Sequence, residues 1–298
     1  MAHLGLIYGI LGGFAALISA GAWAFSSILF RKLGDEISPL GMNLGKCVIG
    51  TLYLGVVVFF VGIAPVSSRA FLFLGASGLL GIACGDTFFF KALIYLGPRL
   101  TLLLETLGPA VTIILAVIFL RERPSPLAWT GILLTLGGIS WVLWEDLSKE
   151  KNGKDRIAGI KYAILFLLCN SIGIILAKIG VAAVPTLQAT FIRLFWGLIG
   201  LSVWGYATGQ IKKWLVPFNN RGLLKFIFFA AFVAIFGGFW LSLLALKYID
   251  VSIATILSST TPLFILPMSA FILKEKISMH KIIGAVVAVA GVVLVFLG

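Results

Sequence analysis

The chain has 298 residues, of which 60% are hydrophobic and only 11% are charged, and its mean hydropathy is +1.13. A soluble domain carries about 25% charged residues, so this chain has too few polar side chains to cover a water-facing surface. The composition excludes an ordinary soluble protein, and no compact basic domain is present that would use the net charge of +12 to bind nucleic acid. In a membrane protein, excess Lys and Arg instead mark the cytoplasmic loops.

Ten apolar segments follow one another along the chain, each close to the roughly 20 residues that a membrane-spanning helix needs. They cover residues 8–30, 40–62, 70–95, 99–120, 126–144, 158–180, 187–206, 223–246, 252–273 and 277–297. Most connections are short, as at Gly97-Pro98, so consecutive helices form antiparallel hairpins. The two longer polar stretches, 145–157 and 207–222, are expected to be loops. The sequence therefore predicts an all-α integral membrane protein with ten transmembrane helices.

The second half of the chain repeats the first. Residues 92–144 align without gaps with residues 245–297 at an offset of 153, which places Pro109 on Pro262 together with matching acidic, basic and glycine positions. The first two helices of each half align at a different offset, 147, and the change of six residues fits an insertion between residues 207 and 222. Chance similarity between apolar segments would not readily place these residue types in one register.

An odd number of helices in each repeat determines how the two halves enter the membrane. Five helices carry the chain across, so the second half begins on the opposite side and runs inverted relative to the first. We expect two inverted five-helix repeats, residues 1–147 and 154–298. Many secondary transporters have this plan, with the substrate near the midplane and alternating access by rocking of the halves.

Two stretches carry the repeat most clearly: ALIYLGPRLTLLLETLGPAVTIILAVIFLRERPSPLAWTGILLTLGGISWVL and ALKYIDVSIATILSSTTPLFILPMSAFILKEKISMHKIIGAVVAVAGVVLVFL. Each resembles the EamA-type repeat of the drug/metabolite transporter (DMT) superfamily. The shared pattern is an Ala-Leu pair, a proline within the next helix, an acidic-basic turn, and a glycine-spaced last helix. The resemblance implies ten helices and export or exchange of small metabolites, such as amino acids, across a bacterial plasma membrane.

Six ionisable residues lie inside the predicted helices, where they usually face the bundle interior or a wet cavity: Lys46, Asp86, Lys91, Glu105, Lys178 and Arg193. With a rise of 1.5 Å per residue, Lys91 and Glu105 lie at a similar depth, about 10 Å from the Gly97-Pro98 turn. Two interpretations stay open: a Lys91–Glu105 ion pair that only locks a hairpin, or a polar site for a zwitterion or a proton. In the second interpretation, Glu105 is the first candidate for the proton carrier and Asp86 is the next.

Lys46 and Arg193 are related by the repeat, which gives each half one cation within reach of an anionic substrate group. The planar fork of an arginine suits a carboxylate or a phosphate. The alternative is that Arg193 and Lys178 extend their charged ends to lipid headgroups.

Prolines interrupt the fourth and ninth helices at Pro109 and Pro262, and a proline frees backbone carbonyls that can face a cavity. Ser258 and Thr261 add hydroxyl groups near Pro262, and Trp240 is a candidate aromatic lining residue. The hydroxyl groups would otherwise act only as hydrogen bonds between helices. Glycines spaced seven apart on the last helix of each half predict close packing between the halves or between protomers.

The loops on one face of the predicted bundle carry fifteen Lys and Arg residues, and those on the other carry four. The positive-inside rule then places both termini outside the cytoplasm. No catalytic, nucleotide-binding or metal-ligand motif is present, so we expect no enzyme, cofactor or metal. The sequence predicts a secondary transporter in the plasma membrane, an exporter of a small polar metabolite, as a monomer or homodimer, with protons as the candidate coupling ion. A channel, a scaffold protein, an intramembrane enzyme or an exporter of another small organic ion or drug are the alternatives.

Overall fold

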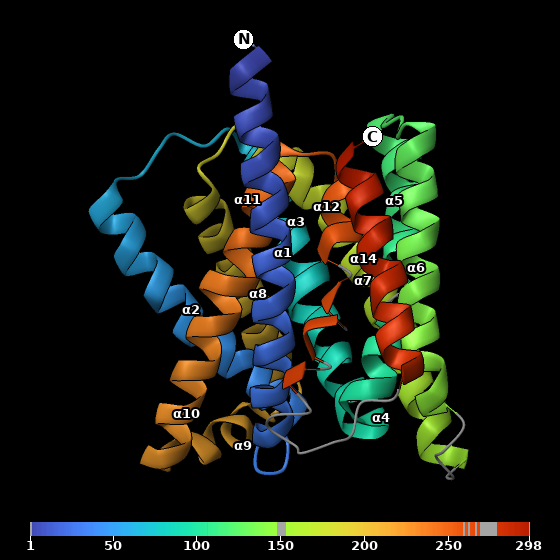
Figure 1. Ribbon diagram of the computed structural model, residues 1–298. Helices are drawn as coiled ribbons and strands as arrows, with labels where there is room; N and C mark the ends of the chain where they lie inside the picture. The colour runs from blue at the N-terminus through green and yellow to red at the C-terminus, as the bar shows by residue number, and fades with distance from the viewer. Residues whose placement is uncertain are drawn as a thin grey trace.

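The computed structural model describes residues 2–105, 107–147, 153–258, 260–261, 263–265, 267–268 and 279–297, and these residues form helices and connections without strands (Figure 1). The helices are α1 (Ala2–Leu33), α2 (Pro39–Val61), α3 (Ser68–Ser77), η1 (Gly78–Asp86), α4 (Thr87–Glu105), α5 (Gly108–Leu115), η2 (Ala116–Leu120), α6 (Pro126–Leu147), α7 (Gly153–Val181), α8 (Thr186–Ala207), α9 (Ile211–Leu215), η3 (Val216–Asn219), α10 (Arg221–Phe232), η4 (Val233–Trp240), α11 (Leu241–Tyr248), α12 (Val251–Ser258) and α14 (Met279–Leu297).

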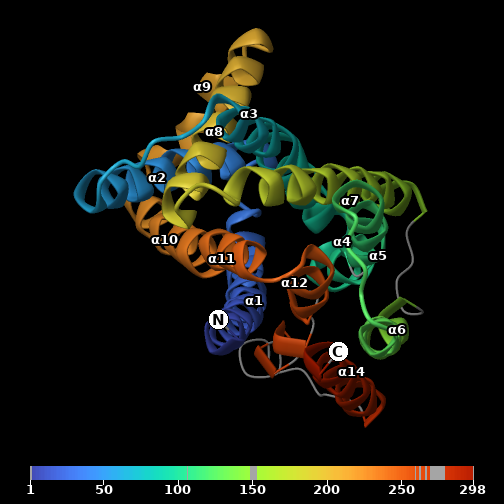
Figure 2. The same cartoon turned by 90° about the horizontal axis from the view of Figure 1, so that it is seen from above.

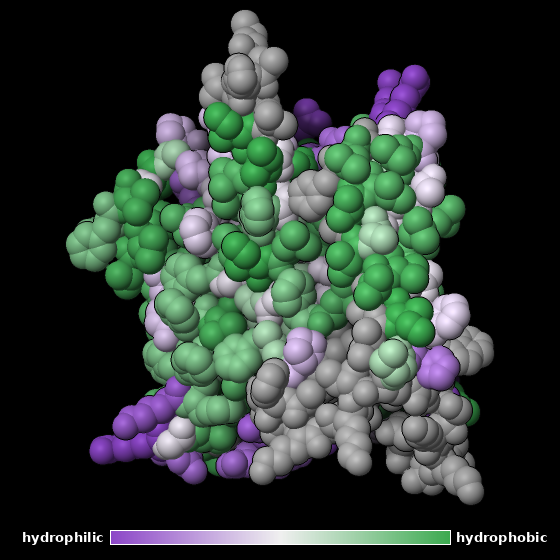
Figure 3. Space-filling view, in the orientation of Figure 1, coloured by the Kyte–Doolittle hydropathy of each residue, from purple (hydrophilic) through white to green (hydrophobic). Residues whose placement is uncertain are grey.

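Six continuous helical stretches are long and apolar enough to cross a membrane: Ile7–Leu33, Pro39–Val61, Ser68–Gly97, Arg156–Val181, Thr186–Ala207 and Arg221–Tyr248. Among the described residues, two shorter apolar helices lie between the third and fourth of these stretches, and one follows the sixth. On the face shown in Figure 3, apolar side chains cover the middle of the bundle and hydrophilic side chains gather near its two ends, where side chains are described. This is the surface that a lipid bilayer requires.

The turn predicted at Gly97 lies within α4. Gly97 has φ 73° and ψ 170°, a backbone conformation that glycine adopts without the steric cost that a Cβ would bring. The residues before it complete the long stretch that begins at Ser68, and the residues after it lead towards α5. Helix α4 therefore contains the end of one crossing and the start of the next.

The expectation of a loop over residues 207–222 was wrong. This segment contains α9 and η3, because two of its aromatic side chains are anchored in the bundle. Trp214 is only 3% exposed, and its ring lies 2.6 Å from where a Cβ on Gly205 would stand. Phe218 packs in the same way against Gly45.

The packing between the halves repeats the sequence symmetry. Ile82 of η1 fills the space that Gly197 of α8 leaves open, and Ile235 of η4 fills the space that Gly50 of α2 leaves open. Gly50 and Gly197 are related by the offset of 147, and the two isoleucines by the offset of 153. Helix α2 of the first half therefore packs against η4 of the second half in the same way as α8 of the second half packs against η1 of the first.

The helices α6 and α14 lie side by side at one edge of the bundle (Figure 2). Gly138 meets the backbone of α14 at Gly284, and Gly291 meets the backbone of α6 at Gly131. Of the two uses predicted for the spaced glycines, these contacts show packing between the halves. Small residues allow helix backbones to approach closely when no hydrophobic effect drives association.

The segment that follows η2 also joins the halves. The Glu122 carboxylate accepts hydrogen bonds from the backbone N–H groups of Val251 (2.8 Å) and Ser252 (3.0 Å), and from the Ser252 hydroxyl (2.7 Å). A carboxylate at a helix N-terminus satisfies free N–H groups and interacts favourably with the helix dipole. Glu122 therefore caps α12 of the opposite half.

Candidate functional site

A cavity of about 150 Å³ lies within the bundle, between helices of both halves. Helices α1, α4 and α5 of the first half contribute to its wall, together with α7, α8, α11 and α12 of the second. Its charged and polar lining residues, with the indole of Trp23, are Ser19, Trp23, Asp86, Glu105, Thr112, Asn170, Arg193, Ser242, Thr255, Ser258 and Thr261. The cavity therefore brings charged and polar side chains together inside the bundle.

The cavity follows the repeat. Trp23 and Asn170 are related by the offset of 147, and both line it. Glu105 and Ser258 are related by the offset of 153, and both line it as well. Equivalent positions of the two halves thus face each other across the cavity, but with different chemistry.

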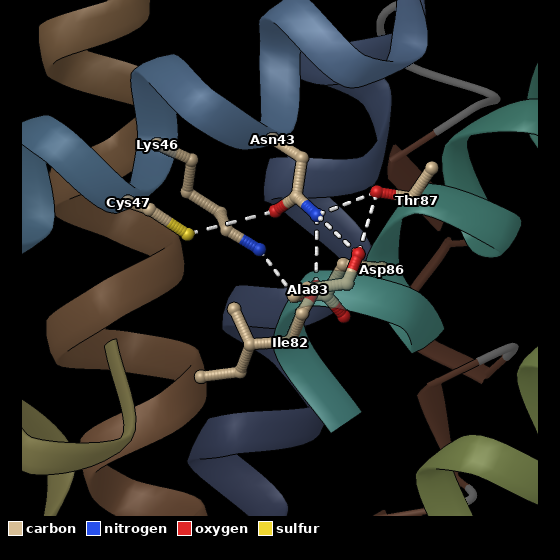
Figure 4. A network of polar contacts seen from close by, with 7 residues as sticks. All are labelled: Asn43, Lys46, Cys47, Ile82, Ala83, Asp86 and Thr87. Carbon is tan, nitrogen blue, oxygen red and sulfur yellow. Dashed lines mark hydrogen bonds and ion pairs between the residues drawn. The ribbon is translucent and has the colours of Figure 1, made fainter. Parts of the chain in front are cut away.

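The wall contributed by η1 is held by a buried polar network (Figure 4). Lys46 of α2, fully buried, forms an ion pair with Asp86 at the end of η1. The Asn43 side chain donates hydrogen bonds to the Ile82 carbonyl oxygen (2.8 Å) and to the Thr87 hydroxyl (3.0 Å). A π-helix departs from the regular α-helical hydrogen-bond pattern, and Asn43 satisfies backbone oxygen at this point. The network fixes Asp86 where η1 meets the cavity.

The ammonium of Lys46 also lies against two aromatic rings. Its Nζ atom is 4.9 Å from the ring centroid of Phe239 and 5.5 Å from that of Phe90. Aromatic faces attract a cation, most strongly where water is excluded. Because Asp86 and these rings hold it, Lys46 lies behind the cavity wall rather than on it.

Glu105, the last residue of α4, faces the cavity. Its Oε2 atom is buried and has no hydrogen-bond partner, while the Trp23 side chain is hydrogen-bonded to the carboxylate. An acceptor left without a partner in a buried site costs free energy unless a ligand, a proton or water satisfies it. Glu105 is therefore available for a ligand.

Arg193 of α8 also lines the cavity and is 6% exposed. The guanidinium lies beside Gly81, with its Nη2 atom 3.5 Å from where a Cβ on that glycine would stand. Its Nε atom is buried without a hydrogen-bond partner. Among the residues that the structure describes, ion pairs join Lys46 to Asp86 and Arg31 to Asp35, and neither pair includes Arg193. It is a buried cation with free donor capacity at the cavity.

Five residues predicted as site residues line this one cavity: Asp86, Glu105, Arg193, Ser258 and Thr261. Lys46 does not line the cavity, but it forms an ion pair with Asp86, which does. The sequence prediction missed several lining residues, among them Trp23, Asn170 and Phe239. The repeat offset could have found Asn170 once Trp23 was known, and Phe239 as the residue that matches Asp86.

Two predicted site residues lie elsewhere. The ion pairs among the described residues do not include one between Lys91 and Glu105, and the Lys91 Nζ atom lies 4.8 Å from the ring centroid of Tyr162. Trp240 donates a hydrogen bond from its indole to the Thr186 hydroxyl (3.0 Å) and is not a lining residue. Both residues therefore contact neighbouring helices and do not line the cavity.

The proline positions are described only in part. Helix α4 ends at Glu105 and α5 begins at Gly108, so the helix is interrupted directly before Pro109. The interruption places the Gly108 carbonyl oxygen 3.4 Å from the hydroxyl of Ser171, which donates to it. Pro262 lies outside the described residues.

The comparisons with known proteins agree with the internal repeat. The sequence profile of the EamA-like transporter family matches the chain twice, over residues 10–144 and 157–297. A protein of Archaeoglobus fulgidus named as an uncharacterized transporter is 24% identical over 285 residues, which are 95% of this chain and 96% of that protein.

Two further similarities span nearly the whole chain. A protein of Latilactobacillus sakei subsp. sakei that carries the name ribose uptake protein RbsU is 27% identical over 300 residues, covering 92% of this chain and 95% of that protein. A crystal structure with 16% sequence identity superposes with a TM-score of 0.72 over 97% of each chain. This last similarity shows a shared fold.

Proposed function

This chain belongs to the EamA-like transporter family, and we propose that it is a secondary transporter that exports a small polar metabolite, such as an amino acid, by alternating access. The observation that carries the proposal is the charged cavity between the two halves. Equivalent positions of the repeats face this cavity, as expected for a substrate site between two moving units.

We further propose ten transmembrane helices in two inverted five-helix repeats, residues 1–147 and 154–298. The six long apolar stretches and the shorter apolar helices support this count. The start of α1 and the end of α14 lie at the same end of the bundle (Figure 1), which an even number of crossings requires.

The proposed coupling ion is the proton, carried by Glu105. This carboxylate faces the cavity with one buried oxygen free, so a proton or a cationic group of the substrate can occupy it. If only one of the two binds at a time, uptake of a proton on one side of the membrane drives release of the substrate there. Coupled exchange follows from this competition.

Counterflow in liposomes tests the proposed function. Purified protein is reconstituted and loaded with an unlabelled solute, and entry of the same labelled solute is followed for amino acids, organic anions, organic cations and ribose. A carrier gives saturable flux that is accelerated by solute on the opposite side. Flux that rises linearly with concentration and shows no counterflow would indicate a channel, and no flux of any solute would favour a scaffold protein.

The proposed location is the plasma membrane, with both termini outside the cytoplasm, as the charge asymmetry of the predicted loops predicts. The protein would then operate between the cytoplasm and the exterior, as a monomer or a homodimer. The name of the Latilactobacillus relative makes ribose a solute that the transport panel must include.

A further inference from the structure

We propose that the cavity binds a small zwitterion, with its carboxylate on Arg193 and its ammonium group on Glu105. This inference rests on the proposed transport function and names the substrate class of the same site. Its basis is that each half of the protein places on the cavity one charged group that has no ion-pair partner among the described residues, and that the two charges are opposite in sign.

The positive charge has no ion-pair partner because the repeats differ at one position. Lys46 and Arg193 are equivalent residues of the two halves. In the first half Asp86 neutralises Lys46, but the residue equivalent to Asp86 in the second half is Phe239. Arg193 therefore has no carboxylate of its own half. Asp86, which also lines the cavity, attracts Arg193 electrostatically but forms its ion pair with Lys46.

The negative charge lacks an ion-pair partner for a similar reason. The residue equivalent to Glu105 in the second half is Ser258, which has no charge. Lys91, the lysine at a similar depth, lies against Tyr162. Glu105 keeps one oxygen without a partner and receives a hydrogen bond from the neutral Trp23 side chain.

Arg193 and Glu105 do not neutralise each other. Described ion pairs, with nitrogen and oxygen no more than 4.0 Å apart, join Lys46 to Asp86 and Arg31 to Asp35. The two free charges thus face one cavity from α8 and α4 with space between them. A molecule with two opposite charges fills this space and gives each buried group a partner.

The same charges disfavour other solutes. A buried charge without a counter-charge is strongly destabilising. A neutral sugar would hydrogen-bond to both groups but leave both charges uncompensated. A dicarboxylate would place a negative group beside Glu105, and a simple amine would leave Arg193 unpaired. The zwitterion is the one of these classes that matches both.

The size and the remaining wall restrict the zwitterion further. A cavity of about 150 Å³ holds a ligand near the size of benzene. Phe166, Phe239 and Leu167 give part of the wall an apolar surface. An amino acid with a small side chain fits this combination.

Matched ligands test the proposal on the unmodified protein. Full-length protein in detergent micelles is titrated by calorimetry with L-alanine, L-serine and L-threonine. Propionate and ethylamine serve as the analogues of alanine that lack its amine or its carboxylate, and ribose and succinate represent the other classes. We expect at least one amino acid to bind tenfold or more tightly than each of these four compounds.

Two variants assign the ends of the ligand. Glu105→Gln should remove the advantage of the amino acid over propionate, because the counter-charge of the ammonium group is gone. Arg193→Gln should remove the advantage of the amino acid over ethylamine, because the counter-charge of the carboxylate is gone. Lys212→Gln, at an exposed position of α9, is the control and should bind as the unmodified protein does. If Arg193→Gln does not fold, the ligand series on the unmodified protein still decides the question.

The proposal is overturned if none of the three amino acids binds, or if any of the four other compounds binds as tightly as the best of them. Saturable counterflow of ribose or succinate in liposomes would then leave the transport function intact and change only the substrate class. Absence of counterflow for every solute would instead contradict the transport function itself.

Discussion

Gly138 of α6 lies directly against Gly284 of α14, so that a Cβ on Gly138 would stand 2.6 Å from the Gly284 carbonyl oxygen. The repeat produces the mirror contact, in which a Cβ on Gly291 would stand 2.7 Å from the Gly131 carbonyl oxygen. Backbone atoms cannot move aside as the end of a flexible side chain can. The spacing of these two helices therefore depends on glycine.

Gly138→Ala should lower the thermal stability of the purified protein, because the added methyl group forces α6 and α14 apart. Overpacking of this kind costs about 1–3 kcal/mol. The neighbouring Gly137→Ala is the matched control, since a Cβ there meets nothing within 4 Å. It should be neutral or stabilising by up to about 1 kcal/mol, through the higher helix propensity of alanine. Equal melting temperatures for the two variants would contradict the close contact.

The Lys46–Asp86 pair predicts a non-additive pattern of stability. Lys46→Met or Asp86→Asn alone leaves a buried charge without its partner, which costs about 3–5 kcal/mol. The double variant removes both charges and should recover most of this loss. Size-exclusion chromatography and thermal unfolding in detergent measure the effect. Additive losses in the double variant would show that the two residues act independently.

Lys91→Gln should have little effect on transport. The lysine contacts the Tyr162 ring rather than Glu105, and an interaction of this kind contributes about 0.5–1 kcal/mol where it is partly exposed. We expect a small decrease in melting temperature and an unchanged rate of saturable exchange. Loss of exchange in a folded variant would return Lys91 to the candidate site.

Glu105→Gln separates exchange from coupling. Glutamine keeps the length of the side chain and its hydrogen-bonding capacity, but it does not carry a titratable proton. The variant should fold and should exchange substrate at saturating concentration, with reduced affinity, while substrate accumulation driven by a pH gradient is lost. Liposomes with and without an imposed gradient make the comparison. Normal proton-driven accumulation would leave Asp86 as the coupling residue to test.

Reporter fusions test the orientation. A reporter after the C-terminal residue should behave as extracytoplasmic, and one inserted within residues 145–157 as cytoplasmic, because the more basic loops remain inside. Alkaline phosphatase and green fluorescent protein fusions give opposite signals on the two sides. The reverse pair of signals would invert the proposed orientation.

The helical fold could be predicted because the length of each apolar segment, at the constant rise of an α-helix, can be compared directly with the thickness of a bilayer. The helices within residues 207–222 could not be predicted. Their position depends on the packing of Trp214 against Gly205 and of Phe218 against Gly45. These contacts join residues whose proximity no local pattern encodes.

The candidate site shows the same limit at the level of single side chains. Counting residues gives the depth of a side chain but not the direction in which it points. Five residues further along an α-helix is a rotation of about 140°, so Lys91 points away from the direction of Asp86. Trp240 directly follows the lining residue Phe239 in η4, so its side chain leaves the helix in a different direction. Depth alone could not separate these residues from those that line the cavity.

The unequal residues at equivalent positions around the cavity have an energetic consequence. If both halves carried the same side chains, exchanging their conformations would give two states of identical free energy, open to opposite sides. Here Asp86 matches Phe239 and Glu105 matches Ser258, so the exchange places different groups in each environment. In the proposed alternating-access cycle, the two open states would then differ in free energy, and the empty protein would favour the state open to one side of the membrane.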